Sequence, residues 1–389
     1  MYYEKKTTKW ISPTICVTHY CQLNCIYCYE NNKDTQNRLD FDVAQHIIEE
    51  IFHSATPEVD GIEFCFIGGE PLIEFELIKQ IVEYFCERKK NYKQKFIFSA
   101  TTNGALLTDK MKKWFASNTD KIILCLSLDG AKETHDHNRS NSFDLIDFDF
   151  FLTNYPNQGV KMTLSEYSLP RLYENVTFIH SLGFKRINGV NLYEGDFDFS
   201  DEKYLRILVP QLQKLVDFYS KEENNELFNQ LFDKRLELTQ SQLRRYRKNC
   251  GVGGAGVRFY DVDGKSYPCV MCTTMTLTGD QIDNLQTFDM EDDQLFVDSK
   301  CNQLCLIYPI CSNCSGSNYK SRGNFATRDY SKCMIKKLEV LFCAELMARK
   351  ILHNRDVCEN STVLYHTIQA IKDIKRLYYP LFRQYIENV

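Results

Sequence analysis

The chain has 389 residues, of which 43% are hydrophobic and 25% charged, and its net charge is −5. This composition is ordinary for a globular protein, and the acidic balance excludes the basic surface that a nucleic-acid partner requires. No apolar run is long enough to cross a membrane, and no signal-peptide core follows the N-terminus. We therefore expect a cytoplasmic protein with no nucleic-acid and no membrane partner.

Strands and helices alternate through the first half of the chain. Short apolar runs predict strands at 14–18, 62–67, 95–101, 122–128, 160–164 and 186–191. Apolar residues at helical spacing predict helices at 42–52, 75–88, 108–117, 144–153, 169–182 and 204–219. This alternation predicts an α/β fold with parallel strands, either a barrel or a doubly wound sheet. In β/α barrels the site lies at the C-terminal ends of the strands.

The composition changes after this first unit, which we place at residues 1–220. Residues 221–249 are polar and predict a helical bridge, 250–333 are rich in cysteine and glycine, and 334–389 are helical again. Within the third part, Asp261-Val262-Asp263-Gly264 separates two short apolar stretches and predicts a β-hairpin.

Three cysteines follow the first predicted strand. Cys21, Cys25 and Cys28 have the spacing C-x3-C-x2-C. The chain has 17 cysteines, and in a reducing compartment metal or redox chemistry is a better explanation for them than disulfides. Three close thiolates suit an iron–sulfur cluster and leave one iron of a four-iron cluster open. Zinc, disulfides and buried free thiols are the alternatives that the spacing alone leaves.

The second predicted strand ends in Gly68-Gly69-Glu70-Pro71. Together with the three cysteines, this motif resembles the radical S-adenosylmethionine (SAM) enzymes. The resemblance implies a partial (β/α)6 barrel, a [4Fe-4S] cluster on the three thiols, and binding of the SAM amino group at Gly68, Gly69, Glu70 and Pro71. Glycine suits such a cradle because backbone without Cβ can approach a ligand closely. In this family the reduced cluster cleaves SAM to a 5′-deoxyadenosyl radical.

The resemblance also implies further SAM contacts at the ends of later strands. Tyr27 corresponds to an aromatic position against the adenine, and Asn103 and Ser127 to positions near the ribose and carboxylate. Asp129 belongs to the same group, and Arg139 is a candidate partner of the SAM carboxylate. The alternatives are a core aromatic for Tyr27, a turn cap for Asp129 and a surface salt bridge for Arg139.

A second group of cysteines lies in the C-terminal half. Its members are Cys250, Cys269, Cys272, Cys301, Cys305, Cys311, Cys314 and Cys333. Alone, this group also fits a zinc module; with the N-terminal motifs it resembles the SPASM extension of radical SAM enzymes, which holds auxiliary four-iron clusters. By that resemblance, one cluster is closed by Cys301, Cys305, Cys311 and Cys333, and the other is held by Cys250, Cys269 and Cys314. The usual spacing C-x2-C-x5-C-x3-C appears here with its outer spacings exchanged, which leaves the ligand geometry open.

For the cluster held by Cys250, Cys269 and Cys314, the sequence leaves two alternatives for the fourth ligand. Related enzymes often supply it a few residues before the first cysteine of the group, where this chain has none. Cys272 is the nearest candidate, and the alternative is an open iron that binds a substrate sulfur or carboxylate. The remaining cysteines are interpreted as core residues, because free cysteine is commonly buried: Cys16, Cys65, Cys86, Cys125, Cys343 and Cys358.

The resemblance implies an oxidoreductase, a radical SAM/SPASM maturase. It would take hydrogen from a ribosomally made peptide or protein and install a C–C, C–S or C–O cross-link or another oxidative modification. Auxiliary clusters would accept or relay electrons, and an external donor of the flavodoxin or ferredoxin type would reduce the SAM cluster. Glu194, after the sixth strand, is the candidate catalytic contact or base, with a solvated loop carboxylate as its alternative.

Two other functions remain as hypotheses. An anaerobic sulfatase-maturing enzyme, which forms formylglycine, carries an acidic residue directly after the second SPASM cysteine, where this chain has Val270. A non-catalytic iron–sulfur or zinc protein is the hypothesis from another class, and the Gly-Gly-Glu-Pro motif argues against it. Only about a dozen residues precede the first strand, so we expect no leader-binding domain there.

Overall fold

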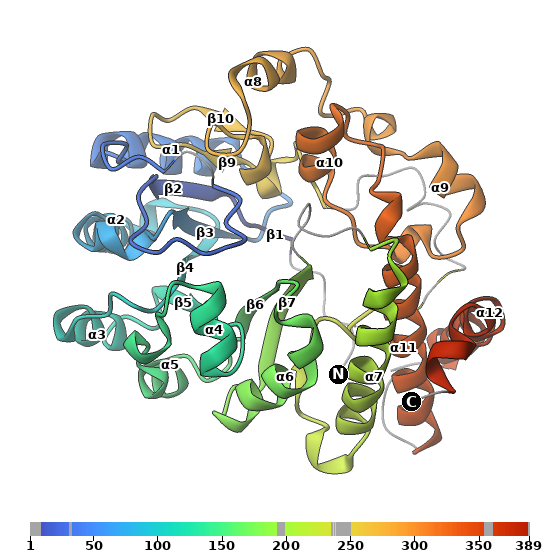
Figure 1. The fold of residues 1–389 in the computed structure, drawn as a ribbon. Coiled ribbons are helices and arrows are strands. Elements are labelled where there is room, and N and C mark those ends of the chain that lie inside the picture. Colours follow the sequence, from blue (N-terminus) through green and yellow to red (C-terminus); the bar gives the residue numbers. More distant parts are fainter. Residues whose placement is uncertain are drawn as a thin grey trace.

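The computed structural model describes residues 9–30, 33–192, 199–234, 236, 238, 250–353 and 361–387. Its N-terminal part is built on parallel strands that succeed one another in chain order (Figure 1). The first sheet contains β2 (Thr14–Thr18), β3 (Gly61–Gly68), β4 (Lys95–Thr102) and β5 (Ile122–Leu126), and the second contains β6 (Val160–Leu164), β7 (Arg186–Leu192) and β8 (Phe228–Asn229). A parallel bridge between Ser127 and Lys161 connects the two sheets. The six predicted strands are confirmed.

The helices that connect these strands lie on the outer side of the sheet (Figure 1). They are α1 (Phe41–Ser54), α2 (Phe75–Glu87), α3 (Asp109–Ala116), α5 (Phe148–Asn154), α6 (Leu172–Ser181) and α7 (Glu202–Tyr219). In α1, Ile47, Ile48 and Ile51 are buried at helical spacing. Between helices and sheet, the rings of Phe64 and Phe98 stack 5.4 Å apart in a core of aromatic side chains. This core fixes where the strands end.

Two expectations about helices are corrected. The structure adds α4 (Lys132–Asn138), whose sequence Lys-Glu-Thr-His-Asp-His-Asn has no apolar period to predict it. The predicted bridge at 221–249 is not helical where it is described: Glu222–Asn224 form a 3₁₀ turn and β8 pairs with β7. Strand pairing satisfies the backbone there in place of helical hydrogen bonds. Residues 239–249 lie outside the described ranges.

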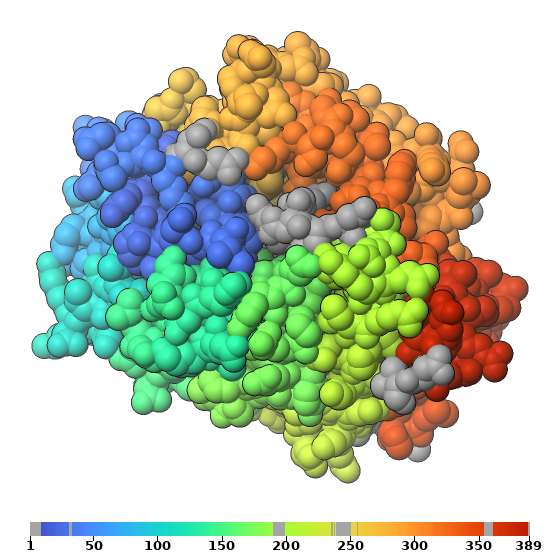
Figure 2. All heavy atoms as spheres, in the orientation of Figure 1, coloured from blue at the N-terminus to red at the C-terminus, as the bar shows by residue number. Residues whose placement is uncertain are grey.

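The C-terminal part joins the same sheet. The predicted hairpin is confirmed as β9 (Phe259–Tyr260) and β10 (Ser266–Tyr267), and β9 pairs in parallel with β2. The short strand β1 (Trp10–Ile11) pairs with β3, and the amide of Ser12, next to it, donates to the carbonyl of Gly256 in the C-terminal part at 3.0 Å. In Figure 2 the amber residues of the C-terminal part border the blue N-terminal residues. The cysteine-rich segment is therefore seated beside the first strand of the barrel.

The remaining elements are helical. They are α8 (Gly279–Leu285), α9 (Ser299–Leu304), α10 (Ser315–Arg322), α11 (Cys333–Leu352) and α12 (Ser361–Ile386). The last two confirm the helices expected at the end of the chain, and α11 packs against both α7 and α12. Within the described ranges, no helix has the length and apolarity that a membrane span requires.

Candidate functional site

The loop that carries the three N-terminal cysteines begins where β2 ends, and the end of β3 packs directly on it. The amide of Gly69 donates to the carbonyl of Thr18 at 2.9 Å, and the amide of Glu70 donates to that of Tyr20 at 2.9 Å. A Cβ on Gly68 or Gly69 would lie 2.3 Å from the backbone of Thr18 or Tyr20, respectively. Sequence reasoning assigned these glycines to a ligand; the structure shows that they also let β3 approach the cysteine loop.

Cys21, Cys25 and Cys28 are partly buried on this loop, and none of them forms a disulfide. Burial raises the pKa of Cys21 to about 12. Their sulfurs do not all lie within 4.8 Å of one another, as the ligands of one ion would. In a four-iron cluster each thiolate binds a different iron, so its ligands stand farther apart than those of a single ion. The three thiols are therefore not gathered as the ligands of a single ion.

Glu70 connects the ends of β3 and β4. Its carboxylate accepts hydrogen bonds from Thr102 Oγ1 at 2.7 Å, from the amide of Leu72 at 3.1 Å and from the amide of Asn103 at 2.8 Å. The side chain is buried, and burial raises the pKa of this carboxyl to about 7. The Glu70 side chain thus fixes the strand edge, while the backbone of the Gly-Gly-Glu-Pro segment forms the candidate cradle.

A buried network surrounds Asp129 after β5. One carboxylate oxygen accepts from Tyr27 Oη at 2.5 Å and from Asn138 Nδ2 at 3.1 Å, and the Arg139 Nε lies 3.1 Å from it. The other oxygen accepts from the amide of Thr163 at 2.9 Å. Tyr27, Asp129 and Arg139 are all buried. The surface salt bridge considered for Arg139 is therefore wrong, because the pair is internal.

Asn103 and Ser127 lie at the same edge of the sheet. The Asn103 amide oxygen accepts from Gln22 Nε2 at 3.2 Å, and its nitrogen lies 3.9 Å from Cys21 Sγ. Ser127 is buried and its amide donates to the carbonyl of Thr102 at 2.9 Å. The structure thus brings Asn103 to the cysteine loop. Glu194 lies outside the described residues.

Four C-terminal thiols form one group around α9 and the start of α11. Cys301 lies on α9, Cys305 follows it, Cys311 follows the 3₁₀ turn Tyr308–Ile310, and Cys333 begins α11. Burial, then Asp298 and the charges of Cys333 and Cys305, raise the pKa of Cys301 to about 12. Burial, then the charges of Cys311 and Cys305, raise the pKa of Cys333. These thiols therefore lie within electrostatic range of one another, and their role as ligands of one cluster stays a prediction.

A second group lies where α10 meets the hairpin segment. The sulfurs of Cys269 and Cys272 are 3.7 Å apart. The contact with Cys269, then burial and the charges of Cys314 and Cys250, raise the pKa of Cys272 well above its ordinary value. Of these thiols, Cys272 is buried, while Cys250 and Cys314 are exposed. Cys272 thus contacts Cys269 and lies within electrostatic range of Cys314 and Cys250.

Tyr29 lies between the N-terminal loop and this second group. Burial raises the pKa of its hydroxyl, and the charges of Glu30, Cys28, Cys16 and Cys269 act in the same direction. A thiol of the N-terminal loop and a thiol of the C-terminal group therefore both lie close to one side chain. Cys28 and Cys269 thus both lie within electrostatic range of Tyr29.

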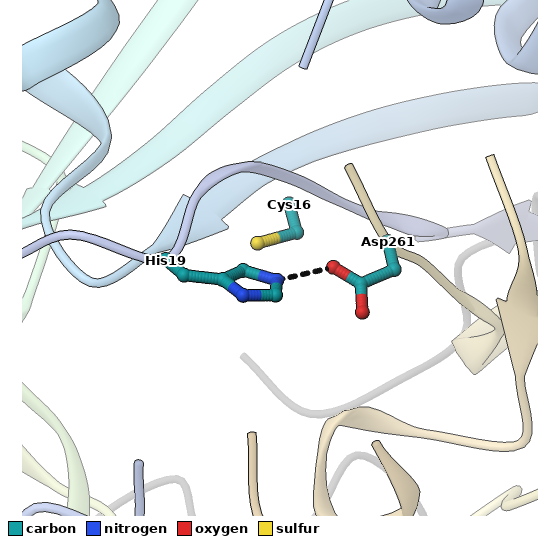
Figure 3. Close-up of side chains that lie close together, drawn as sticks. All are labelled: Cys16, His19 and Asp261. Carbon is teal, nitrogen blue, oxygen red and sulfur yellow. Dashed lines mark hydrogen bonds and ion pairs between the residues drawn. The ribbon is translucent and has the colours of Figure 1, made fainter. Parts of the chain in front are cut away.

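Sequence analysis missed two buried carboxylates, those of Asp261 and Glu30. His19 Nε2 lies 2.6 Å from an Asp261 carboxylate oxygen, with the thiol of Cys16 beside them (Figure 3). Asp261 also accepts from Thr274 Oγ1 at 3.3 Å. This contact spans 242 positions, and no local pattern links its members. Glu30 is also buried, and one of its carboxylate oxygens has no partner among the described residues.

Comparison with known proteins agrees with this geometry. Residues 14–145 match the family model described as a 4Fe-4S single cluster domain. An uncharacterized protein of Methanocaldococcus jannaschii is 27% identical over 65% of this chain and 82% of its own length. A cysteine-type anaerobic sulfatase-maturating enzyme of Clostridium perfringens is 27% identical over 64% of this chain and 71% of its own length. The radical SAM cyclopropyl synthase TigE of Paramaledivibacter caminithermalis is 25% identical over 32% of this chain and 28% of its own length.

Solved structures share the fold. His-tagged anSMEcpe with bound AdoMet has a TM-score of 0.66 and 17% identity, and the match covers 92% of this chain and 98% of the other. SuiB of Streptococcus suis bound to its precursor peptide SuiA has a TM-score of 0.56 and 16% identity, with 83% and 76% covered. Taken with the three-cysteine loop and the Gly-Gly-Glu-Pro edge, these matches show that the chain is similar to radical SAM enzymes, and it shares the fold of solved structures with bound AdoMet.

Proposed function

We propose that this maturase removes hydrogen from a side chain or backbone carbon of a ribosomally made peptide and installs a cross-link or another oxidative modification. The observation that carries the proposal is the pair of C-terminal thiol groups, one of which neighbours the SAM-cluster loop through Tyr29. Oxidative bond formation needs an electron acceptor near the radical, and iron–sulfur clusters at these thiols would supply one.

The N-terminal site divides its tasks among three strand ends. Cys21, Cys25 and Cys28 would hold the SAM-binding cluster, and the backbone of the Gly-Gly-Glu-Pro segment, with Asn103, would line the SAM site. When bound, cluster and SAM together supply the 5′-deoxyadenosyl radical. The three thiols leave one cluster iron for SAM, so no fourth protein ligand is needed there.

The Asp129 network would position this site rather than carry chemistry. Both oxygens of Asp129 already accept hydrogen bonds, which ties Tyr27 to the end of β5. Arg139 neutralises the buried carboxylate, because an unpaired charge there would be costly. Its role as partner of the SAM carboxylate, and the role of Ser127 near the ribose, stay proposals; both residues are buried, and Ser127 is bonded to the end of β4.

The proposed reaction would balance with two electrons leaving the substrate. Bound SAM and its cluster would supply the group that removes one hydrogen atom from the substrate. The C-terminal thiols would hold the cluster that accepts the second electron, and a base would take the proton as the new bond forms. An external donor of the flavodoxin or ferredoxin type supplies the electron that cleaves SAM. Glu194 stays the candidate base by sequence alone.

Formation of formylglycine is the second candidate function. The relatives favour it, since a sulfatase-maturating enzyme of Clostridium perfringens aligns over 71% of its length. Val270 disfavours it, because it occupies the position after Cys269 where that family carries an acid. The group that would take the substrate proton is thus missing at that position.

Two assays test the proposal. The reconstituted enzyme should form 5′-deoxyadenosine from SAM and dithionite without oxygen; absence of product with full iron content contradicts the enzyme assignment. Co-expression with a short peptide encoded beside this chain should yield a peptide lighter by two hydrogens, located by mass spectrometry. Conversion of the cysteine in the Cp18Cys peptide, which is bound in a structure of anSMEcpe, to formylglycine would instead support the second candidate.

A further inference from the structure

A buried arginine lies beside the C-terminal thiol group that consists of Cys301, Cys305, Cys311 and Cys333. We propose that this residue, Arg328, is a positioning residue that makes the auxiliary cluster of the group easier to reduce. Its guanidinium would offset the negative charge of the cluster and offer it an N–H donor. The inference rests on the proposed function, which places a cluster here as acceptor of the second substrate electron, and it names the residue that tunes this acceptor.

Arg328 is a buried cation that has no acidic partner in the described part of the chain. The residue is 8% exposed, and its Nε has no hydrogen-bond partner among the described residues. Arg139 is buried to the same degree, but the Asp129 carboxylate lies 3.1 Å from its Nε. A buried charge without a partner is costly. Arg328 is therefore suited to an anion, and a four-iron cluster bound by four thiolates is one.

The Asp298 carboxylate attaches the backbone of Arg328 to the helix that carries Cys301. One oxygen of Asp298 accepts from the amide of Cys301 at 2.9 Å and so caps α9. The other oxygen accepts from the amide of Arg328 at 3.1 Å and from Tyr330 Oη at 2.9 Å. These bonds engage Asp298 with backbone amides and a hydroxyl rather than with the guanidinium. The first cysteine of the group and Arg328 are thus held by one buried side chain.

The guanidinium of Arg328 lies on the buried ring of Tyr308. Its Cζ is 4.1 Å from the ring centroid. Tyr308 belongs to the short segment between two cysteines of the group. Its amide donates to the carbonyl of Cys305 at 3.3 Å, and its carbonyl accepts from the amide of Cys311 at 3.4 Å. The positive charge is therefore fixed against the turn that joins these two cysteines.

The fourth cysteine follows Arg328 along the chain after one turn. Asp329 caps the 3₁₀ turn Tyr330–Lys332, and Cys333 begins α11 directly after it. Hydrogen bonds, a ring contact and chain continuity thus tie Arg328 to all four cysteine positions. Net charge and hydrogen bonds to the sulfurs set the reduction potential of an iron–sulfur cluster. Since reduction adds negative charge, a buried cation here should raise the potential.

The competing explanation is that Arg328 only packs on Tyr308 as a structural cation–π pair. That contact accounts for the position of the guanidinium plane. It does not account for the buried Nε, which has no hydrogen-bond partner among the described residues. The two explanations differ in what a variant changes. A purely structural arginine affects stability alone, whereas a residue that acts on the cluster also changes its reduction potential.

The test removes the SAM cluster first and then measures potentials. A Cys21→Ala/Cys25→Ala/Cys28→Ala parent, reconstituted with iron and sulfide, should hold about eight irons per chain in two auxiliary clusters. A redox titration followed by EPR gives the midpoint potential of each. Adding Arg328→Gln should shift one of them to a more negative value, because the charge and the N–H donor are lost. Adding Arg328→Lys, which keeps the charge but not the guanidinium, should give a smaller shift in the same direction.

Two further variants assign the shift. Cys333→Ser should alter the EPR signal whose potential Arg328→Gln shifts, which identifies the cluster. Lys300→Gln is the matched control, because it removes an exposed cation next to Cys301 on α9, and solvent screens such a charge. It should leave both potentials in place. A shift in Lys300→Gln as large as that in Arg328→Gln would overturn the inference.

The remaining outcomes are decisive as well. Unchanged potentials in an Arg328→Gln protein with the iron content of its parent would overturn the inference. Where Arg328→Gln does not retain iron, Arg328→Lys decides: a potential more negative than that of the parent supports the inference, and an equal one overturns it. A parent that binds zinc in place of iron would instead contradict the cluster assignment. Absent 5′-deoxyadenosine formation by the wild-type enzyme would contradict only the radical function.

Discussion

The N-terminal cysteine loop and the C-terminal thiol groups are held in place by different means. The loop is fixed by strand ends, by two glycines packed on its backbone and by the Asp129 network, on top of a large aromatic core. The C-terminal groups lie on short helices, 3₁₀ turns and a hairpin, and the apolar cluster beside them is small. The barrel has a large core of its own, whereas the auxiliary region has a small apolar cluster beside its thiols.

The two regions also differ in the number of cysteines assigned to each site. The loop carries three cysteines, and the sequence assigns four to each C-terminal group. A three-thiol cluster keeps an iron for SAM, and a four-thiol cluster is closed and stable. The comparison suggests that chemistry and electron storage are separated between a preformed barrel edge and a metal-dependent region.

The largest expected effect is on turnover. The triple variant Cys21→Ala/Cys25→Ala/Cys28→Ala should form no 5′-deoxyadenosine above background, because no open iron remains to bind SAM, and should lose about four irons per chain. Cys65→Ser is the matched control, since Cys65 is a partly buried cysteine on β3 outside all three groups. Equal loss of activity in the control would show that the barrel, not the cluster, had failed.

Removal of iron should affect the folding of the two regions differently. Structural metal sites contribute on the order of 10 kcal/mol to folding at neutral pH, so anaerobic chelation should unfold residues 250–333 and leave the barrel core folded. Hydrogen exchange followed by mass spectrometry measures this. Rapid exchange in the auxiliary region with continued protection of β3 and β4 is the expected result. Simultaneous loss of both would contradict the proposed independence of the barrel.

The sequence predicted the elements whose pattern is local. The strand at 14–18 is found with the same bounds, and Asp263-Gly264 correctly indicated the hairpin. The helix α4 was missed because its seven residues are almost all polar. The thiols were recognisable by chemistry and spacing. Their grouping was not: that Cys272 faces Cys314 depends on how α10 docks at Gly316.

The contacts that hold the barrel edge to the auxiliary hairpin were beyond sequence analysis. His19 and Asp261 are 242 positions apart, and neither belongs to a motif that names the other. They meet because β9 pairs with β2. A strand of two residues is too short for its sequence to indicate which strand it will pair with. Tertiary packing decided this part of the site.

The buried His19–Asp261 contact connects the barrel edge to the auxiliary hairpin. His19→Ala should lower the free energy of unfolding by about 3 to 5 kcal/mol, because it leaves a buried carboxylate without its main partner. Lys265→Ala on the same hairpin removes only an exposed pair with Asp263 and should leave the free energy of unfolding essentially unchanged. Anaerobic denaturant unfolding measures both. Equal losses of unfolding free energy in the two variants would mean that the buried contact does not stabilise the connection between barrel and hairpin.

Close packing at the end of β3 should matter next. Gly69→Ala places a Cβ 2.3 Å from the Tyr20 backbone and should destabilise by about 3 kcal/mol, the upper end of overpacking effects. It should also weaken SAM binding, measured by the change that SAM produces in the EPR spectrum of the reduced cluster. Gly279→Ala on α8, where a Cβ meets nothing within 4 Å, is the control. An unaltered Gly69→Ala protein would show that the loop adapts and is not preformed.

The smallest effect concerns His135, which supports the Asp129 turn as a neutral side chain. It accepts from the amide of Asp129 at 3.4 Å, contacts Ser142 Oγ at 3.1 Å, and burial lowers its pKa to about 4. Because the unfolded chain binds this proton near pH 6.5 and the folded chain does not, the contribution is complete above that pH and is lost as pH falls toward 4. Wild type should therefore lose about 2 kcal/mol of stability between pH 7 and pH 5 that His135→Asn does not lose.

Denaturant unfolding at the two pH values, with the exposed His46→Asn variant as control, measures this difference. Comparing variants at each pH cancels the acid sensitivity of the clusters, which all three proteins share. If His135→Asn keeps the full pH dependence, the neutral histidine does not support the turn. A selective loss would show that the barrel edge depends on protein hydrogen bonds, where the auxiliary region depends on metal.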